Sequence, residues 1–436
     1  MKRLCLSVFM AMAAPGAVSA QDRPHAFVGA HVIPVDSPEI ESGVLIVQGG
    51  RIVAVGSANA IEVPEGAVLH DVTGKVIMPG LVCTHSHIGG PSGGDGSNPI
   101  QPEARVLDSV NVRSQGFKRA LAGGLTTLNI MSGSGHLISG QTIYIKLRDG
   151  HTIEELVYRW EDGAVMGGLK MANGTNSQRQ PPFPGTRGKS ASLVREKYVK
   201  AQEYMRKIEA AAGDASRMPE RDLSLEPLVE AMRGRRIVHH HTHRHDDVMT
   251  VLRLSKEFGF RVVLHHVSEG WKVAKEIAAA KAPCSLILVD SPGGKLEAID
   301  LIHETASVLE KEGALIAFHT DDWITDSRVF LRMPALGIRA GLSRETALKS
   351  VTINGAEMLD LTERIGSLTP GKDADFIVLS GDPFSVYTHV EQTWVEGVVR
   401  FDRANPEDRL YATGGYGAGD DTRPYLCCQD EGGQTQ

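Results

Sequence analysis

The stretch Val76-Ile-Met-Pro-Gly-Leu-Val-Cys-Thr-His-Ser-His-Ile88 decides how this chain is interpreted. It begins as an apolar, β-branched run and ends in two histidines one residue apart. Because residues i and i+2 of an extended strand share a face, His85 and His87 can bind the same ion. Neutral imidazoles suit zinc or another borderline divalent metal, provided that distant residues complete the shell. The alternative interpretation is two polar residues at a strand end.

The apolar lead-in with Pro79-Gly80, followed by His-Ser-His, resembles the first barrel strand of the amidohydrolase superfamily of metal-dependent hydrolases. Within it, the chain is most similar to the imidazolonepropionase-like and periplasmic dipeptidase-like branch. The resemblance extends over residues 26–400 and includes the Gly366-Ser-Leu-Thr-Pro-Gly motif. It implies further ligands in a fixed order, a lysine, two histidines and an aspartate. Residues of these types stand in that order at Lys170, His241, His266 and Asp321.

Composition narrows the class of protein. The chain has 436 residues, of which 42% are hydrophobic and 23% are charged. This length accommodates a barrel of about 250 residues and a smaller domain. With a net charge of -7 and no basic block interleaved with aromatic residues, nucleic acid is excluded as a partner. The expected partner is a small-molecule substrate, and association into a homo-oligomer is compatible with the composition.

Residues 1–20 have the layout of a secretory signal peptide. Lys2 and Arg3 precede an apolar run over residues 4–14, and Val18-Ser-Ala20 supplies a small-residue cleavage site. The apolar run is too short to anchor the chain in a bilayer. We therefore expect an exported protein without a membrane anchor, periplasmic if its source is a Gram-negative bacterium.

Short β-type runs separated by turns occur near both ends of the chain, and Gly49-Gly50 predicts a hairpin between two of them. They predict a small composite β-sandwich domain built from both ends. The middle of the chain alternates apolar runs with helical periodicity, which predicts an α/β fold with a (β/α)8 TIM barrel. The expected boundaries are 1–20 for the signal peptide, 21–78 and 365–415 for the sandwich, 79–364 for the barrel and 416–436 for a polar tail.

The expected barrel strands are residues 81–87, 125–131, 141–147, 168–172, 236–241, 261–266, 285–290 and 314–320. The clearest expected helices are residues 192–212, 246–258, 272–281, 295–312 and 343–359. Residues 175–189, rich in Asn, Gln, Pro and Gly, predict a long loop that is a candidate substrate cover. In such a barrel the active site lies at the C-terminal ends of the strands.

Lys170 stands inside an apolar strand, where a lysine is costly unless it is neutral or paired. In the branch that the chain resembles, a lysine in a similar setting carries a carbamate, as N6-carboxylysine, that bridges two metals. A carbamate requires a deprotonated amine, which desolvation favours. Lys146 is the alternative candidate for this position.

The histidine-rich run over residues 237–247 offers several ligands. Strand parity places His239, His241 and His243 on one face. The resemblance favours His241, with His239 and His243 as alternatives. In the next strand, His265 and His266 face opposite ways, so only one can serve, and His266 lies at the strand end.

Asp321 closes the last expected strand, where the resemblance places a metal-binding aspartate. A carboxylate there can hold the first metal and accept a proton from water, although a helix cap is the alternative for an isolated Asp-Asp pair. By parity with His85, Cys83 is a buried filler, as is Cys284. Cys427 and Cys428 are assigned no function.

The predicted function is that of an exported metal-dependent amidohydrolase acting on a dipeptide, an N-acyl amino acid or a cyclic amide. In this hypothesis His85, His87 and Asp321 hold one zinc or other divalent ion, His241 and His266 hold a second, and carboxylated Lys170 bridges them. A metal-activated hydroxide would attack the amide carbonyl, and Asp321 would pass its proton to the leaving amine. The candidate substrate contacts are His136, Asn173, His243 and Arg244.

Three alternatives stay open. One is a mononuclear zinc site in which His266 contacts the substrate, as in the deaminases and cyclic-amide hydrolases of the superfamily. Another is a lactonase on the same barrel. The third is an exported metal-binding protein without catalysis, prompted by the histidine-rich run. The order of ligands at successive strand ends argues against the third, since sequestration needs no carboxylate base.

Overall fold

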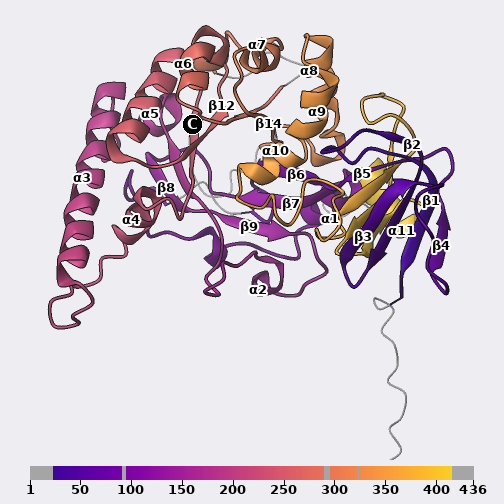
Figure 1. Cartoon of the computed structure of the whole chain (residues 1–436). Coiled ribbons are helices and arrows are strands. Elements are labelled where there is room, and N and C mark those ends of the chain that lie inside the picture. The colour runs from indigo at the N-terminus through magenta and orange to yellow at the C-terminus, as the bar shows by residue number, and fades with distance from the viewer. Residues whose placement is uncertain (1–22, 91–94, 289–294, 323, 415–436) are drawn as a thin grey trace, which may run out of the picture.

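The computed structural model describes residues 23–90, 95–288, 295–322 and 324–414 (Figure 1). The predicted signal peptide, the polar tail with Cys427 and Cys428, and residues 289 and 290 of an expected strand lie outside this part of the chain. Within the described residues, no helix combines the length and apolar character needed to cross a membrane.

Both ends of the chain contribute strands to one eight-stranded sheet. The N-terminal part supplies β1 (His25–Val32), β2 (Ile40–Gln48), β3 (Arg51–Ser57), β4 (Val68–Asp71) and β5 (Val76–Pro79); the C-terminal part supplies β15 (Phe376–Leu379), β16 (Val390–Val395) and β17 (Val398–Asp402). The two parts join where β5 pairs antiparallel with β15, with Pro79 opposite Phe376. Strands from both ends therefore share a sheet, and the sandwich arrangement stays a prediction.

The hairpin expected at Gly49-Gly50 is confirmed, since β2 and β3 pair antiparallel on either side of it. Both glycines have positive φ, 57° and 76°, which a two-residue hairpin turn requires. The sheet buries an aromatic cluster in which the rings of Phe27 and Trp394 meet edge to face at 5.0 Å and those of Phe376 and Trp394 stack at 5.6 Å. Such pairs add to the stability that burial provides.

The central strands form two further sheets. The smaller contains β6 (Leu81–Ser86), β7 (Leu125–Ile130) and β9 (Ile143–Lys146); the larger contains β8 (Ile138–Gln141), β10 (Leu169–Ala172), β11 (Val238–Thr242), β12 (Val262–His266), β13 (Cys284–Leu286) and β14 (Ile316–Phe318). The mixed α/β class is confirmed. The strand ladders do not form one closed ring among the described residues; where β14 approaches β6, the amide of Asp321 donates to the carbonyl of His85, 3.2 Å away.

The strand expected at residues 141–147 is wrong. Those residues divide between β8, which pairs antiparallel with β10, and β9, which pairs antiparallel with β7. The break falls at Thr142, whose amide donates to the carbonyl of Gly168 and whose hydroxyl accepts from the amide of Gly168. Thr142 is thereby tied to the segment before β10, and the ladder is interrupted.

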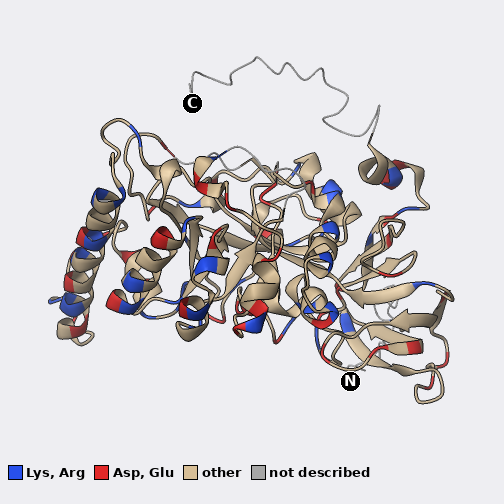
Figure 2. Cartoon of the chain, turned by 90° about the horizontal axis from the view of Figure 1, so that it is seen from above, with Lys and Arg blue, Asp and Glu red and all other residues tan. Residues whose placement is uncertain are grey.

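The helices are α1 (Gln115–Ala122), α2 (Ile153–Leu156), α3 (Arg187–Ala211), α4 (Glu226–Met232), α5 (His245–Phe258), α6 (Ala274–Ala279), α7 (Thr305–Lys311), α8 (Arg332–Arg339), α9 (Arg344–Ser350), α10 (Ile353–Glu357) and α11 (Pro406–Thr413). Helices α3 to α10 lie outside the central strands (Figure 1). Lys and Arg positions alternate with Asp and Glu positions along these helices (Figure 2).

Two expected helices are broken. Residues 295–312 divide into a short 3-10 turn, Leu296–Ala298, and α7; between them Asp300 is held by Lys272 and by the indole of Trp271. Residues 343–359 divide into α9 and α10 because Thr352, with φ -135° and ψ -101°, leaves the helical conformation. The expected loop at 175–189 is shorter, since α3 begins at Arg187.

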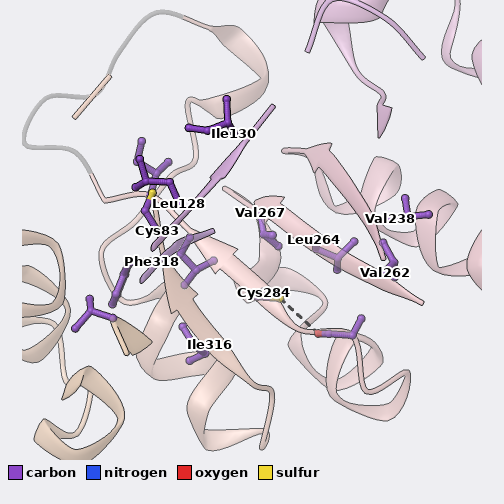
Figure 3. Close-up of a cluster of buried hydrophobic side chains, with 14 of the residues drawn as sticks. Cys83, Leu128, Ile130, Val238, Val262, Leu264, Val267, Cys284, Ile316 and Phe318 are labelled. Carbon is purple, nitrogen blue, oxygen red and sulfur yellow. Dashed lines mark hydrogen bonds between the residues drawn. The ribbon is translucent and has the colours of Figure 1, made fainter. Parts of the chain in front are cut away.

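A buried apolar layer lies beneath the strand ends. Side chains of β6, β7, β11, β12, β13 and β14 pack together in it, including Cys83 and Cys284 (Figure 3). Both cysteines are fully buried, and burial raises the pKa of the Cys83 thiol to about 12. The prediction that they act as buried fillers is therefore confirmed.

Candidate metal centre

Parallel register brings the expected ligands together. Along β10, β11 and β12, Ala172 pairs with His241, and His241 pairs with His265, so that His266 emerges beside Thr242. β6 carries His85, and the segment after β14 carries Asp321. The six expected ligands, His85, His87, Lys170, His241, His266 and Asp321, thus meet at the C-terminal ends of these strands.

Asp321 lies among three of the expected histidines. One carboxylate oxygen, Oδ1, lies 2.9 Å from Nε2 of His87 and 3.5 Å from Nε2 of His85. The other, Oδ2, lies 3.9 Å from Nδ1 of His266. Burial by itself raises the pKa of this carboxyl, but His87 and His319 outweigh burial and hold the pKa at about 2. Asp321 is therefore an anion at neutral pH.

Two of these residues have strained backbones. His266 has a φ of 70° and Asp321 a φ of 47°, in the left-handed region that non-glycine residues rarely occupy. Each such conformation costs about 1–3 kcal/mol and persists where the surroundings enforce it, often at functional sites. Here the strain turns both side chains toward the same point.

The buried histidines are uncharged. Burial, followed by the positive charge of Lys170 at His85 and by neighbouring histidines at His241 and His266, holds the pKa of each ring well below its usual value. Within the described residues, Nδ1 of His85, Nδ1 of His241 and Nε2 of His266 are buried and have no hydrogen-bond partner. Unsatisfied buried polar atoms are unfavourable. Neutral imidazoles beside a carboxylate form a donor set that fits a divalent cation.

Lys170 is fully buried, with its Nζ 3.4 Å from Nε2 of His85 and 3.2 Å from the sulfur of Met131. Burial lowers the pKa of its amine to about 7, although the charge of Asp321 acts in the opposite direction. A substantial fraction of this amine is neutral near pH 7, as carboxylation of Nζ requires.

The structure does not bring Lys146, the alternative to Lys170, to this centre. β9 runs antiparallel to β7 and directs Lys146 toward Asp373, with which it pairs, and toward Asp375, 3.0 Å away. Glu396 lies 3.4 Å from the same ammonium. Despite full burial, these carboxylates raise the pKa of Lys146. Lys146 is a structural cation that joins the central strands to the segment after Arg364.

The alternatives to His241 have other partners. His239 Nε2 lies 2.9 Å from the hydroxyl of Tyr144, and its Nδ1 lies 3.0 Å from Nε2 of His265. His243 Nδ1 lies 2.7 Å from the hydroxyl of Ser268. Among the three, the ring of His241 lies nearest to that of His266, with 4.4 Å between the ring centres.

His319 is a site residue that the sequence did not reveal. Its fully buried ring stacks on that of His85 at 4.8 Å, and its Nε2 lies 3.3 Å from Nδ1 of His266. Its Nδ1 lies 2.7 Å from the hydroxyl of Ser285. His319 therefore orients two expected ligands. Strand parity with Asp321, two residues later, was the available signal.

The candidate substrate contacts all have partners within the protein. His136 Nε2 lies 2.8 Å from the carbonyl of Asp95, and the Asn173 amide donates to the carbonyl of Asp247. Arg244 pairs with Asp246 at the start of α5. Their role in binding substrate, like that of His243, stays a prediction.

The chain is similar to known proteins of one enzyme family. Residues 209–401 match the model described as "Amidohydrolase family". The crystal structure of an amidohydrolase from Thermotoga maritima MSB8 is 36% identical, has a TM-score of 0.80, and is matched over 87% of this chain and 100% of that chain.

Two curated relatives are more distant. An imidazolonepropionase from Deinococcus radiodurans is 26% identical over 378 residues, covering 78% of this chain and 86% of the relative. The amidohydrolase tasK from Hapsidospora irregularis is 27% identical over 391 residues, or 83% of this chain; those residues span 40% of its own length. With the full-length match to the Thermotoga structure, these findings show that the chain belongs to the amidohydrolase family, enzymes that hydrolyse carbon–nitrogen bonds.

Proposed function

We propose that this protein is an exported, metal-dependent hydrolase that cleaves the amide carbon–nitrogen bond of a small substrate, a dipeptide, an N-acyl amino acid or a cyclic amide. The observation that carries the proposal is the position of the Asp321 carboxylate, within 4 Å of nitrogens of His85, His87 and His266. A site at the C-terminal ends of parallel strands, which is where (β/α)8 barrels carry their active sites, supports the proposal. The layout of residues 1–20 supports export to the periplasm.

His85, His87 and Asp321 would hold one divalent ion, and His241 and His266 a second, with carboxylated Lys170 between them. When bound, such ions polarise the amide carbonyl and lower the pKa of water from about 15.7 to near 7. The protein contributes neutral imidazoles, since burial holds the pKa of His85, His241 and His266 well below its usual value, and a lysine whose pKa of about 7 leaves the amine available for carboxylation.

Asp321 is the residue placed to move a proton. Its carboxylate is ionised, with a pKa of about 2, and lies 2.9 Å from Nε2 of His87. It would accept a proton from the attacking water and deliver it to the leaving nitrogen, which departs as an amine.

The experiment is elemental analysis of protein purified with bicarbonate present, comparing wild type with Lys170→Ala. We expect about two metal equivalents per chain in the wild type and loss of metal and amidase activity in the variant. Lys200→Ala, at an exposed position of α3, is the matched control. Full metal and full activity in Lys170→Ala would eliminate the bridged centre. One equivalent in the wild type would instead support a mononuclear deaminase or cyclic-amide hydrolase.

A further inference from the structure

A group of metal-ligating side chains beyond the six expected ligands adjoins His241. His243 follows β11, and Glu297 lies in the short turn Leu296–Ala298 that precedes α7. Each of the three residues offers one ligand atom within 4.8 Å of those of the other two, and all three residues are buried. No sequence pattern pointed to Glu297, and His243 was expected either to contact the substrate or to replace His241 as a ligand, not to join it.

Each residue has a buried atom that lacks a hydrogen-bond partner within the described parts of the chain: Nδ1 of His241, Nε2 of His243 and Oε1 of Glu297. The rest of each side chain is held in place. His243 Nδ1 lies against Ser268, and Oε2 of Glu297 accepts from the amide of Thr175 at 2.7 Å and lies 3.4 Å from Arg187. The three residues therefore bring one ligand atom each into one small region, and each keeps a buried polar atom without a partner, which a bound cation could satisfy.

The absence of a side chain at Gly174 leaves space for the Glu297 carboxylate. A Cβ atom at this position would lie 2.5 Å from Oε2 of Glu297, and the φ of 78° also disfavours any larger residue. The loop that follows β10 is thus built around the Glu297 carboxylate. A carboxylate that the surrounding backbone holds in one orientation is suited to act as a metal ligand.

We propose that His243 and Glu297 are further ligands of the divalent cation at His241. Imidazole nitrogens and carboxylate oxygens are ligand types that zinc takes in proteins. His266, whose ring stacks on that of His243 at 5.0 Å, lies beside the same ion. The inference rests on the metal centre of the proposed function and adds two ligands to it.

The test is zinc stoichiometry, measured by equilibrium dialysis of chelator-stripped full-length protein followed by elemental analysis. Glu297→Gln removes the anionic ligand, and His243→Asn keeps a polar group near Nδ1 while removing Nε2. We expect each variant to lose about one zinc equivalent relative to wild type. Glu269→Gln is the control, because the Glu269 carboxylate is buried but already bound by His245 and Lys272; it should keep the wild-type stoichiometry.

Gly174→Ala provides a variant that leaves every ligand intact. Displacing the carboxylate should weaken zinc binding about 10–100-fold, as loss of an orienting contact does elsewhere. Thermal unfolding of each variant establishes that it is folded. Wild-type zinc content and affinity in both Glu297→Gln and His243→Asn would overturn the inference, and would leave Glu297 with its ion pair to Arg187.

The outcomes separate the inference from the proposed function. A wild type that binds zinc and loses an equivalent in Glu297→Gln, yet hydrolyses no amide, would retain the inference and reject the function. If the wild type hydrolyses an amide, and Glu297→Gln and His243→Asn both keep its zinc content, the proposed function is retained and the inference is rejected. A wild type that takes up no zinc would reject both.

Discussion

The Oδ1 atom of Asp321 lies 2.9 Å from the Nε2 atom of His87. Asp321 follows the last of the parallel strands and His87 follows the first, so this contact lies where the two ends of the strand series meet. The amide of Asp321 reinforces it by donating to the carbonyl of His85. The carboxylate is therefore positioned by backbone and side chain together.

Asp321→Asn should abolish amide hydrolysis while the protein stays folded. Asparagine has a similar shape and tolerates positive φ better than most residues, but it cannot accept the proton. We expect activity to fall at least about 10²–10⁴-fold, the usual contribution of a general base. Turnover and metal content should be measured on the same preparation. A variant with near wild-type turnover would assign proton transfer to another residue.

His319→Asn should weaken metal binding without removing a direct ligand. Its ring lies against His85 and His266, and its loss frees both to reorient. We expect metal affinity to fall about 10–100-fold, measured by competition with a chromogenic chelator. Ser285→Ala, which removes the hydroxyl at Nδ1 of His319, should show a smaller effect in the same direction. Unchanged affinity in both variants would limit His319 to packing.

Lys146→Met should destabilise the protein and leave its metal content unchanged. Asp375 would lose its buried cation, whereas Asp373 would keep Arg51 and Arg364; leaving a buried carboxylate uncompensated costs about 3–5 kcal/mol. Urea unfolding of metal-free protein measures the loss. Lys170→Met is the informative comparison, because the Lys170 amine is desolvated and an apolar replacement should not lower the stability of the metal-free protein. Equal losses in both variants would contradict the assignment of separate roles.

Stability should fall with acidification through the titration of Glu396. Burial alone would raise the pKa of this carboxyl, but hydrogen bonds from Arg148 and the charge of Lys146 lower it to about 2. A lowered folded-state pKa contributes stability that is present above the unfolded-state pKa of about 4.3 and is lost as the pH falls toward 2.

The corresponding measurement is the free energy of unfolding between pH 5 and pH 2 in wild type and Glu396→Gln. The difference between them should shrink by about 1–2 kcal/mol across this range, since the carboxylate is partly exposed to solvent. A pH-independent difference would show that the Glu396 carboxylate contributes through packing alone.

The sequence predicted most of what depends on local periodicity. Strand parity identified Cys83 as buried and placed His85 with His87, and the order of later ligands anticipated the convergence on Asp321. Positions set by long-range contacts were missed. Thr142 breaks a strand because it bonds to Gly168, which no local pattern shows, and Asp300 interrupts a helix through Lys272 and Trp271. Glu297 was not predicted because its carboxylate becomes a candidate ligand only through contacts with the loop at Gly174 and Thr175, which is distant in the sequence.

The pairing of β5 with β15 also affects how the chain is made. Val76 pairs with Leu379, so all the central strands must emerge from the ribosome before β5 meets this partner. At about 5–20 residues per second, this leaves the edge of β5 open for tens of seconds. An open strand edge is a template for pairing with other chains. Until β15 arrives, this edge of β5 can pair with other chains, and the length of chain between the two strands sets that interval.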